Sequence, residues 1–238
     1  MVGKISVKLT GLTGLLTSLL FILCAARCDE KPFASQLLTF ILPITIQPSD
    51  SLVFIGDTLW IEADVSDSLT EFNTNKKYSL PNFDFGQTDK TSIGIKKLVN
   101  NQLGLPDQVS ATSDFDLIEE IGEIVFPGET FIDFNYKYDI LNKKYSLRIG
   151  IIPKNKGIFC INLLRPDNLN YEGIIDLGKH SNGATIIPVY EDLVSPINSN
   201  TGNNNFELFK QNCLDQSEGP PENYRTNYRF VTFTFKVL

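Results

Sequence analysis

The chain has 238 residues, and its 28 acidic side chains outnumber its 21 basic ones, which gives a formal net charge of −7 at pH 7. This acidic balance argues against nucleic acid and anionic membrane surfaces as partners, because both require clustered lysine and arginine. With 42% hydrophobic residues, the chain can bury a substantial core as one large domain or two small ones.

The first 26 residues have the tripartite pattern of a secretory signal. Lys4 and Lys8 supply positive charge, a leucine-rich uncharged stretch follows, and charges resume at Arg27. The strongly apolar part is shorter than the roughly 20 residues that a spanning helix needs. The pattern therefore predicts a cleaved signal peptide over residues 1–26 and an exported protein.

Two interpretations of the processing stay open. Cleavage after Ala26 fits the small residues that a signal peptidase requires. Alternatively Cys28, which two acidic residues follow, is the lipidated first residue of a lipoprotein, although Arg27 stands where a small residue is expected. Contact with a membrane is expected only through such a lipid anchor.

Most of the remaining chain alternates apolar and polar residues with a period of two, which is typical of strands. In the first half, the strands predicted in this way are 38–46, 51–55, 58–65 and 91–99. Residues 66–77 are interpreted as a polar loop, and residues 115–126 fit either a strand or a short amphipathic helix.

The clearest alternation covers residues 130–140, and it resumes over 145–151 after a polar turn. This pattern predicts an antiparallel hairpin with one wet face. A nearly continuous apolar run at 158–164 follows the next turn, so we expect three consecutive strands to form a meander.

The C-terminal part contains an Asn-rich loop at 198–205, a short helix over 206–213 that Asn205 caps, and a strand over 230–238. A well-patterned terminal strand usually pairs inside the sheet. Many short strands with little helix predict an all-β fold, an antiparallel immunoglobulin-like or Greek-key β-sandwich with a short helix near the C-terminus. We expect one such domain over 27–238, with a sub-boundary near 165–200. A small barrel is the alternative.

Cysteine is sparse: outside the signal, the chain has Cys28, Cys160 and Cys213. Isolated pairs often bond in an oxidising compartment. We therefore predict a Cys160–Cys213 disulfide, which would stabilise the fold by roughly 4 kcal/mol in the chain-entropy model. The alternative is that Cys160 is a small buried apolar residue.

Four short segments carry a resemblance to a known group of proteins. They are 46–50 (IQPSD), 55–61 (IGDTLWI), 80–85 (LPNFDF) and 156–161 (KGIFCI). Over about half of its length, the chain resembles uncharacterised exported proteins of Bacteroidota-type bacteria with immunoglobulin-like modules. The resemblance implies a protein of the periplasm, the outer-membrane surface or the extracellular space, and it transfers no catalytic residues.

The sequence offers little for catalysis. His180 is the only histidine, and the adjacent serine lacks the Gly-x-Ser-x-Gly spacing of a nucleophile elbow. One histidine and dispersed cysteines make a zinc site very unfavourable. No phosphate-binding or dinucleotide loop is present. We therefore predict no catalytic residues, no cofactor and no metal.

Carboxylates form three sequence clusters, and paired carboxylates can hydrolyse glycosides or bind calcium. The clusters are Glu62, Asp64 and Asp67; Asp84 and Asp89; and Asp114, Asp116, Glu119 and Glu120. Because no Asp-x-Asp-x-Asp-Gly loop occurs, solvated strand faces are the favoured interpretation.

Trp60 is the only tryptophan, on the charged side of its predicted strand. It belongs either to the core or to a surface that contacts a ligand. We thus predict a non-enzymatic exported protein of the cell envelope that acts as a binding or structural module for an unknown protein or glycan. The alternatives are a carboxylate-based glycan hydrolase and a subunit of an envelope assembly.

Overall fold

The computed structural model describes residues 36–81, 91–100, 104, 106–164, 173–174, 188–213 and 228–238. The chain divides into two compact units, and nearly all described residues belong to the one formed by Leu37–Ile174 and Val189–Leu238. The signal peptide, Cys28, His180 and most of the expected sub-boundary lie outside the described residues. The expectations for these segments, and for a single domain, therefore stay predictions.

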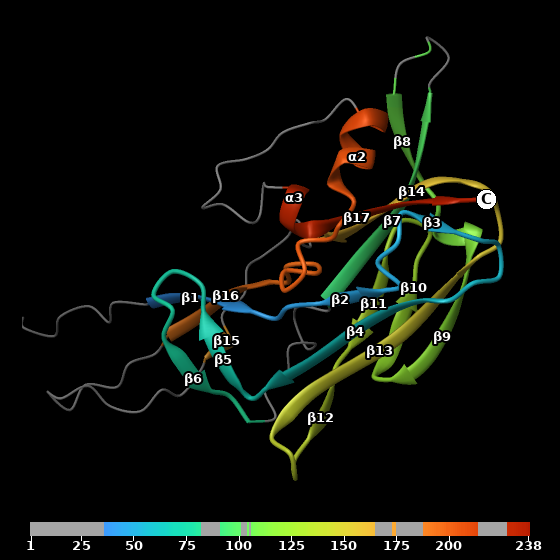
Figure 1. Cartoon of the computed structure of the whole chain (residues 1–238). Coiled ribbons are helices and arrows are strands. Elements are labelled where there is room, and N and C mark those ends of the chain that lie inside the picture. The colour runs from blue at the N-terminus through green and yellow to red at the C-terminus, as the bar shows by residue number, and fades with distance from the viewer. Residues whose placement is uncertain are drawn as a thin grey trace, which may run out of the picture. The chain divides into compact units, whose positions relative to one another are not determined.

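Three sheets contain all of the described strands (Figure 1). Sheet I has the order β10 (Glu123–Pro127), β11 (Ile132–Asn135), β7 (Thr91–Asn100), β14 (Gly157–Leu164), β17 (Thr232–Val237) and β3 (Leu52–Val53), with β8 (Pro106–Ser110) also beside β7. Sheet II has the order β12 (Lys137–Asp139), β13 (Lys144–Pro153), β4 (Leu59–Ser66) and β2 (Thr45–Gln47), with β9 (Phe115–Ile121) also beside β13. Sheet III has the order β15 (Gly173–Ile174), β16 (Pro188–Val194), β1 (Gln36–Ile41), β5 (Ser68–Glu71) and β6 (Lys77–Ser79).

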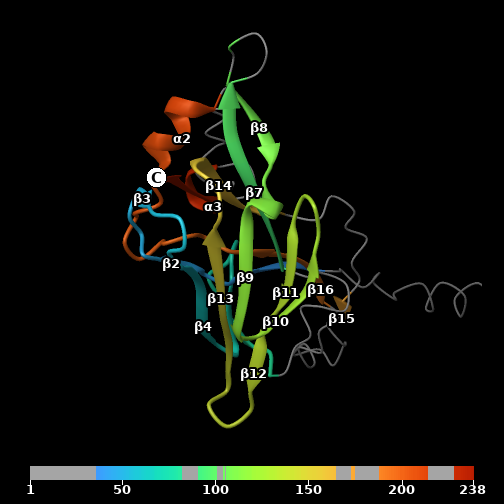
Figure 2. The ribbon, with the colours of Figure 1, turned by 90° about the vertical axis from the view of Figure 1, so that its right-hand side faces the viewer.

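Sheets I and II form a sandwich around the main core (Figure 2). Phe159 and Phe235 of sheet I, and Leu59 and Ile149 of sheet II, belong to one buried cluster and are each at most 1% exposed. The chain passes between the two sheets at the connections β2–β3, β3–β4, β8–β9, β9–β10, β11–β12 and β13–β14. Within sheets I and II, strand pairing is antiparallel except between β3 and β17, which run parallel. The predicted antiparallel β-sandwich is therefore confirmed.

Alternation along the strands builds this core. On β4 the side chains of Leu59 and Ile61 are buried, and on β13 those of Leu147 and Ile149 are buried. The register pairs Ile149 with Ile61, so apolar side chains from neighbouring strands share the inner face. Each such burial contributes about 1.5 to 3 kcal/mol relative to an exposed side chain.

The predicted meander is wrong. The segment expected as one strand over 130–140 divides into β11 and β12, which lie in different sheets, with the break at Tyr136. Only β12 pairs with β13, and β14 pairs with β7 and β17 instead of β13. The break lets β11 bury Phe134 in the core, while β12 packs Tyr138 against Tyr145 with 4.9 Å between ring centroids.

The predicted polar loop over 66–77 contains strand β5, whose Leu69 and Glu71 are buried. The Glu71 carboxylate accepts hydrogen bonds from the backbone N–H and the side chain of both Asn73 and Thr74. A buried charge is tolerated when its acceptors are satisfied in this way. The polar sequence of residues 66–77 suggested a loop. It did not show that the residues after β5 donate the hydrogen bonds that allow Glu71 to be buried.

The ambiguous segment over 115–126 forms two strands, β9 and β10, that belong to different sheets. Gly122 lies between them with a φ of +94°. A Cβ at this position would lie 2.7 Å from the carbonyl oxygen of Asn135. The close approach and the positive φ both require glycine here.

The described helices are the short η1 (Thr112–Asp114) between β8 and β9, and α2 (Phe206–Asn212) and α3 (Tyr228–Val231) near the C-terminus. The expected helix is present, but Asn205 does not cap it: its φ is +55° and its side chain makes no cap hydrogen bond. Instead Asn204 Oδ1 accepts the N–H of Phe206 at 3.3 Å. Strand β17 pairs with β14 and β3, which confirms the internal C-terminal strand. No helix among the described residues is long and apolar enough to cross a membrane.

Candidate functional site

The outward surface of sheet II carries the side chains that alternate with its buried ones. The register places Gly150 beside Trp60 and Arg148 beside Glu62. Strand β9 pairs with the opposite edge of β13 and adds Ile118 and Glu120. We call this surface the Trp60 face, and define it by Trp60, Glu62, Ile118, Glu120, Arg148 and Gly150.

The glycine on β13 determines how Trp60 lies on this face. A Cβ on Gly150 would lie 3.1 Å from Cζ3 of Trp60, 2.9 Å from Cγ2 of Thr58 and 3.3 Å from Cβ of Ile118. The indole therefore occupies the space above the glycine, between strands β4 and β9. Trp60 is partly buried, so it is neither a core residue nor a fully exposed ring.

Arg148 joins three strands across the Trp60 face. Its guanidinium carbon lies 4.3 Å from the Trp60 ring centroid, which is a cation–π contact. Its Nε donates to Glu120 Oε2 at 2.8 Å, and its Nη1 donates to Glu62 Oε1. Arg148 is 35% exposed, and each such surface ion pair contributes about 0 to 1 kcal/mol. The network therefore orders the face more than it stabilises the fold.

The carboxylate clusters of the sequence do not converge in the structure. Glu62 pairs with Arg148, Asp64 lies 2.9 Å from Lys144, and the buried Asp67 accepts a hydrogen bond from Tyr138. The other cluster separates in the same way, with partners for Asp114 (Lys97, Asn155), Asp116 (Lys154), Glu119 (the N–H of Ile124) and Glu120 (Arg148). Asp84 and Asp89 lie outside the described residues.

The ion pairs of these carboxylates are relevant to whether the Trp60 face could hydrolyse glycosides. Glycoside hydrolysis needs two carboxyl groups that act on one substrate in different roles. Glu62 and Glu120 instead both pair with the guanidinium of Arg148. Within the described part of the chain, no three His, Cys, Asp or Glu side chains are grouped to hold a metal ion.

The two cysteines of the predicted disulfide lie together on the other side of sheet I. Cys160 and Cys213 belong to one buried cluster with Leu98, Phe206 and Phe209. Burial, reinforced by the nearby Cys213, raises the pKa of the Cys160 thiol to about 12. The structure thus places both cysteines in one buried cluster, and the disulfide between them stays a prediction.

Sequence reasoning missed Arg148, the residue that connects the face. The sequence did indicate that Arg148 points away from the core, because it stands at a polar position of the alternating strand over 145–151. What the pattern lacked was the register that places Arg148 across from Glu62 and next to the Trp60–Gly150 pair.

No protein-family model and no curated protein matches the sequence. Among solved structures, a type II cohesin domain from the cellulosome of Acetivibrio cellulolyticus matches with a TM-score of 0.26 and 10% identity, over 66% of this chain and 91% of that one. The second type II cohesin module of the adaptor ScaA scaffoldin of the same organism matches with a TM-score of 0.27 and 13% identity, over 65% and 87%. Likenesses this distant carry no argument about function, and the fold class rests on the sheets described above.

Proposed function

We propose that this chain is a non-enzymatic, exported β-sandwich module that binds a protein partner through the Trp60 face. The observation that carries the proposal is the contact between Trp60 and Arg148 on an outward sheet surface. Tryptophan and arginine are the residue types most enriched at the energetic centres of protein interfaces. The signal-like residues 1–26 and the resemblance to exported envelope proteins support the location.

The fold itself does not require this pair of side chains. The core between the sheets is closed by residues such as Leu59, Ile61 and Ile149, which are at most 1% exposed. Trp60 and Arg148 lie on the opposite side of the same strands. A large aromatic side chain held there by a glycine and an arginine is therefore available for contact with another molecule.

The arrangement favours a protein partner over a glycan. A sugar stacks on an aromatic ring, whereas here the Arg148 guanidinium already lies over the Trp60 ring. The ion pairs on both sides of that guanidinium fix its position before binding. Preorganised side chains lose less conformational entropy in an interface, and mixed charges give a protein surface its specificity.

The test measures binding to a partner that is first captured by crosslinking in intact envelopes and then purified. We expect Trp60→Ala to weaken this binding by about 30-fold or more, as loss of an interface hot spot does, with little change in melting temperature. Lys154→Gln is the matched control, because Lys154 pairs with Asp116 on the same sheet but outside the network.

Two outcomes would overturn the proposal. One is a purified partner that binds wild type and Trp60→Ala equally well. The other is Trp60-dependent binding to isolated glycans, which would assign the face to carbohydrate instead.

A further inference from the structure

The turn between β12 and β13 carries the two most exposed large apolar side chains of the described residues. Ile140 is 75% exposed and Leu141 is 89% exposed. Both ribbon views show this turn at the far end of its hairpin, beyond the paired strands of sheet II (Figures 1 and 2). We call residues 140–143 the hairpin tip.

Hydrogen bonds hold the hairpin tip in one conformation. The Asp139 carboxylate accepts from the N–H of Leu141 at 2.9 Å, and from the N–H and the side-chain Nδ2 of Asn142 at 3.0 and 2.6 Å. These donors, led by the Asn142 side chain, keep the pKa of Asp139 below its usual value. Lys143 completes the turn with a φ of +50°. The two apolar side chains are thus displayed by an ordered turn.

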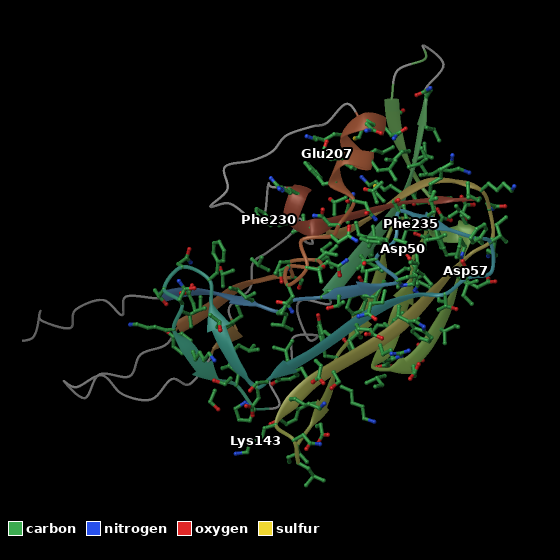
Figure 3. All side chains as sticks on the ribbon, in the orientation of Figure 1. Asp50, Asp57, Lys143, Glu207, Phe230 and Phe235 are labelled. Atoms are coloured by element: carbon green, nitrogen blue, oxygen red, sulfur yellow. The ribbon has the colours of Figure 1, made fainter. Side chains whose placement is uncertain are left out.

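Three lysines flank the apolar pair along the chain. Residues 137–144 contain Lys137, Lys143 and Lys144 against a single acid, Asp139, in a chain whose net charge is −7. Lys137 and Lys143 are exposed, and Lys144 pairs with Asp64 at 2.9 Å. Figure 3 places Lys143 at the end of the hairpin. The lysines come from both sides of the turn, so they flank Ile140 and Leu141.

We propose that the hairpin tip docks on the surface of an anionic lipid bilayer. Ile140 and Leu141 enter the boundary between headgroups and acyl chains, and Lys137 and Lys143 contact the lipid phosphates. Apolar side chains that protrude beside lysines are the combination that binds such interfaces. A bilayer needs no complementary pocket, which suits two adjacent side chains that stand clear of the sheet.

This inference goes beyond the proposed function, because it uses a different surface and a different partner. It also revises the expectation drawn from net charge. The value of −7 is a sum over the whole chain, whereas a lipid surface responds to the charge within about one Debye length of the contact, roughly 10 Å.

The test is co-sedimentation of the purified protein with vesicles of equal parts phosphatidylglycerol and phosphatidylcholine. We expect the double variant Ile140→Ser with Leu141→Ser to lose about tenfold or more in partition coefficient, because two apolar side chains no longer enter the interface. We expect Lys143→Gln to lose about fivefold, and added salt to weaken binding of the wild type. Vesicles of phosphatidylcholine alone should bind less protein.

Phe54→Ser is the matched control, since Phe54 is also an exposed apolar side chain, at 60%, but lies outside the hairpin. It should partition like the wild type. All variants share the same N-terminal segment, so any lipid or signal sequence there cancels in the comparison. Because the tip is exposed, circular dichroism should show unchanged folding.

Wild type that fails to bind anionic vesicles, or a double variant that binds them as well as wild type does, overturns the proposal. The proposal is also overturned if the wild type does not bind vesicles and the double variant loses a protein partner. That result would make the hairpin tip a protein-binding loop instead. Trp60→Ala should leave vesicle binding unchanged, so the failure of either proposal leaves the other one testable.

Discussion

The two outward faces of the sandwich differ in what covers them. On sheet I, α2 packs against β17 and α3 against β14, and Cys160, Thr232 and Thr234 are each 0% exposed. On sheet II, the corresponding face presents Trp60 and Arg148 in a network that is only partly buried. We infer that the covered face of sheet I serves stability, and our proposal assigns partner binding to the Trp60 face of sheet II. Substitutions should therefore affect stability on sheet I and binding on sheet II.

The largest effect is expected where α2 covers sheet I. Phe209 is 0% exposed and belongs to the cluster that contains Cys160 and Cys213. Phe209→Ala should cost about 3 to 5 kcal/mol, through lost burial and the cavity left behind. Denaturant unfolding measures this value. A loss below 1 kcal/mol would show that the helix does not cover the sheet.

The thiol at Cys160 provides a pH test of the same covered face. Its pKa in the folded protein is raised to about 12 from 9.0, first because it is buried. The protonated thiol is thus favoured in the fold, and its contribution is fully present below pH 9. It is lost as the pH rises from 9 towards 12, since the unfolded chain then releases the proton more readily.

We therefore expect the free energy of unfolding, measured under reducing conditions, to fall between pH 9 and 12, and Cys160→Ala to show a shallower fall. Parallel curves for the two proteins would contradict a buried thiol. In an oxidising buffer the predicted disulfide would remove this pH dependence. Thiol titration of the denatured protein distinguishes the two states.

A smaller effect on stability is expected at Gly150, which lies beside Trp60 on sheet II. Gly150→Val would place a side chain against Trp60 and Thr58. We expect a loss of about 1 to 3 kcal/mol from overpacking, together with a shift in the fluorescence of the only tryptophan. Ser146→Val, at another outward position of β13, is the control and should leave the emission unchanged.

The smallest effect on stability is expected for Arg148→Gln. Its ion pairs with Glu62 and Glu120 are partly exposed, so the loss should stay within about 1 kcal/mol. Partner binding should nevertheless weaken, because Trp60 loses the guanidinium that orders it. A large loss of stability with unchanged binding would reverse the distinction between the two faces.

Sequence alternation predicted the inner faces of both sheets well. The strands 58–65 and 145–151, and the C-terminal strand, have their apolar side chains in the core as expected. Alternation could not show what covers the other side of a strand. Thr232 and Thr234 alternate with the core residues Phe233 and Phe235, yet both are buried on the side of the sheet where α2 packs against β17.

The candidate site was predictable only in part. The sequence placed Trp60 on the charged side of its strand, but it left open whether the side chain belongs to the core or to a ligand-contacting surface. Its contacts depend on strand register, which places Gly150 beside it and Arg148 within reach. Register follows from the pairing of strands distant in sequence, which a single sequence does not specify. The break at Tyr136 escaped prediction for the same reason, since both sheets accept the same alternating pattern.

The most direct test of the central claim uses the single tryptophan of the chain. Protein labelled with 5-fluorotryptophan should give one ¹⁹F NMR signal, from Trp60. We expect this signal to shift or broaden when the purified partner binds, because the Trp60 face becomes buried in the interface. A partner that binds while the Trp60 signal stays unchanged would contradict the assignment of this face as the binding surface.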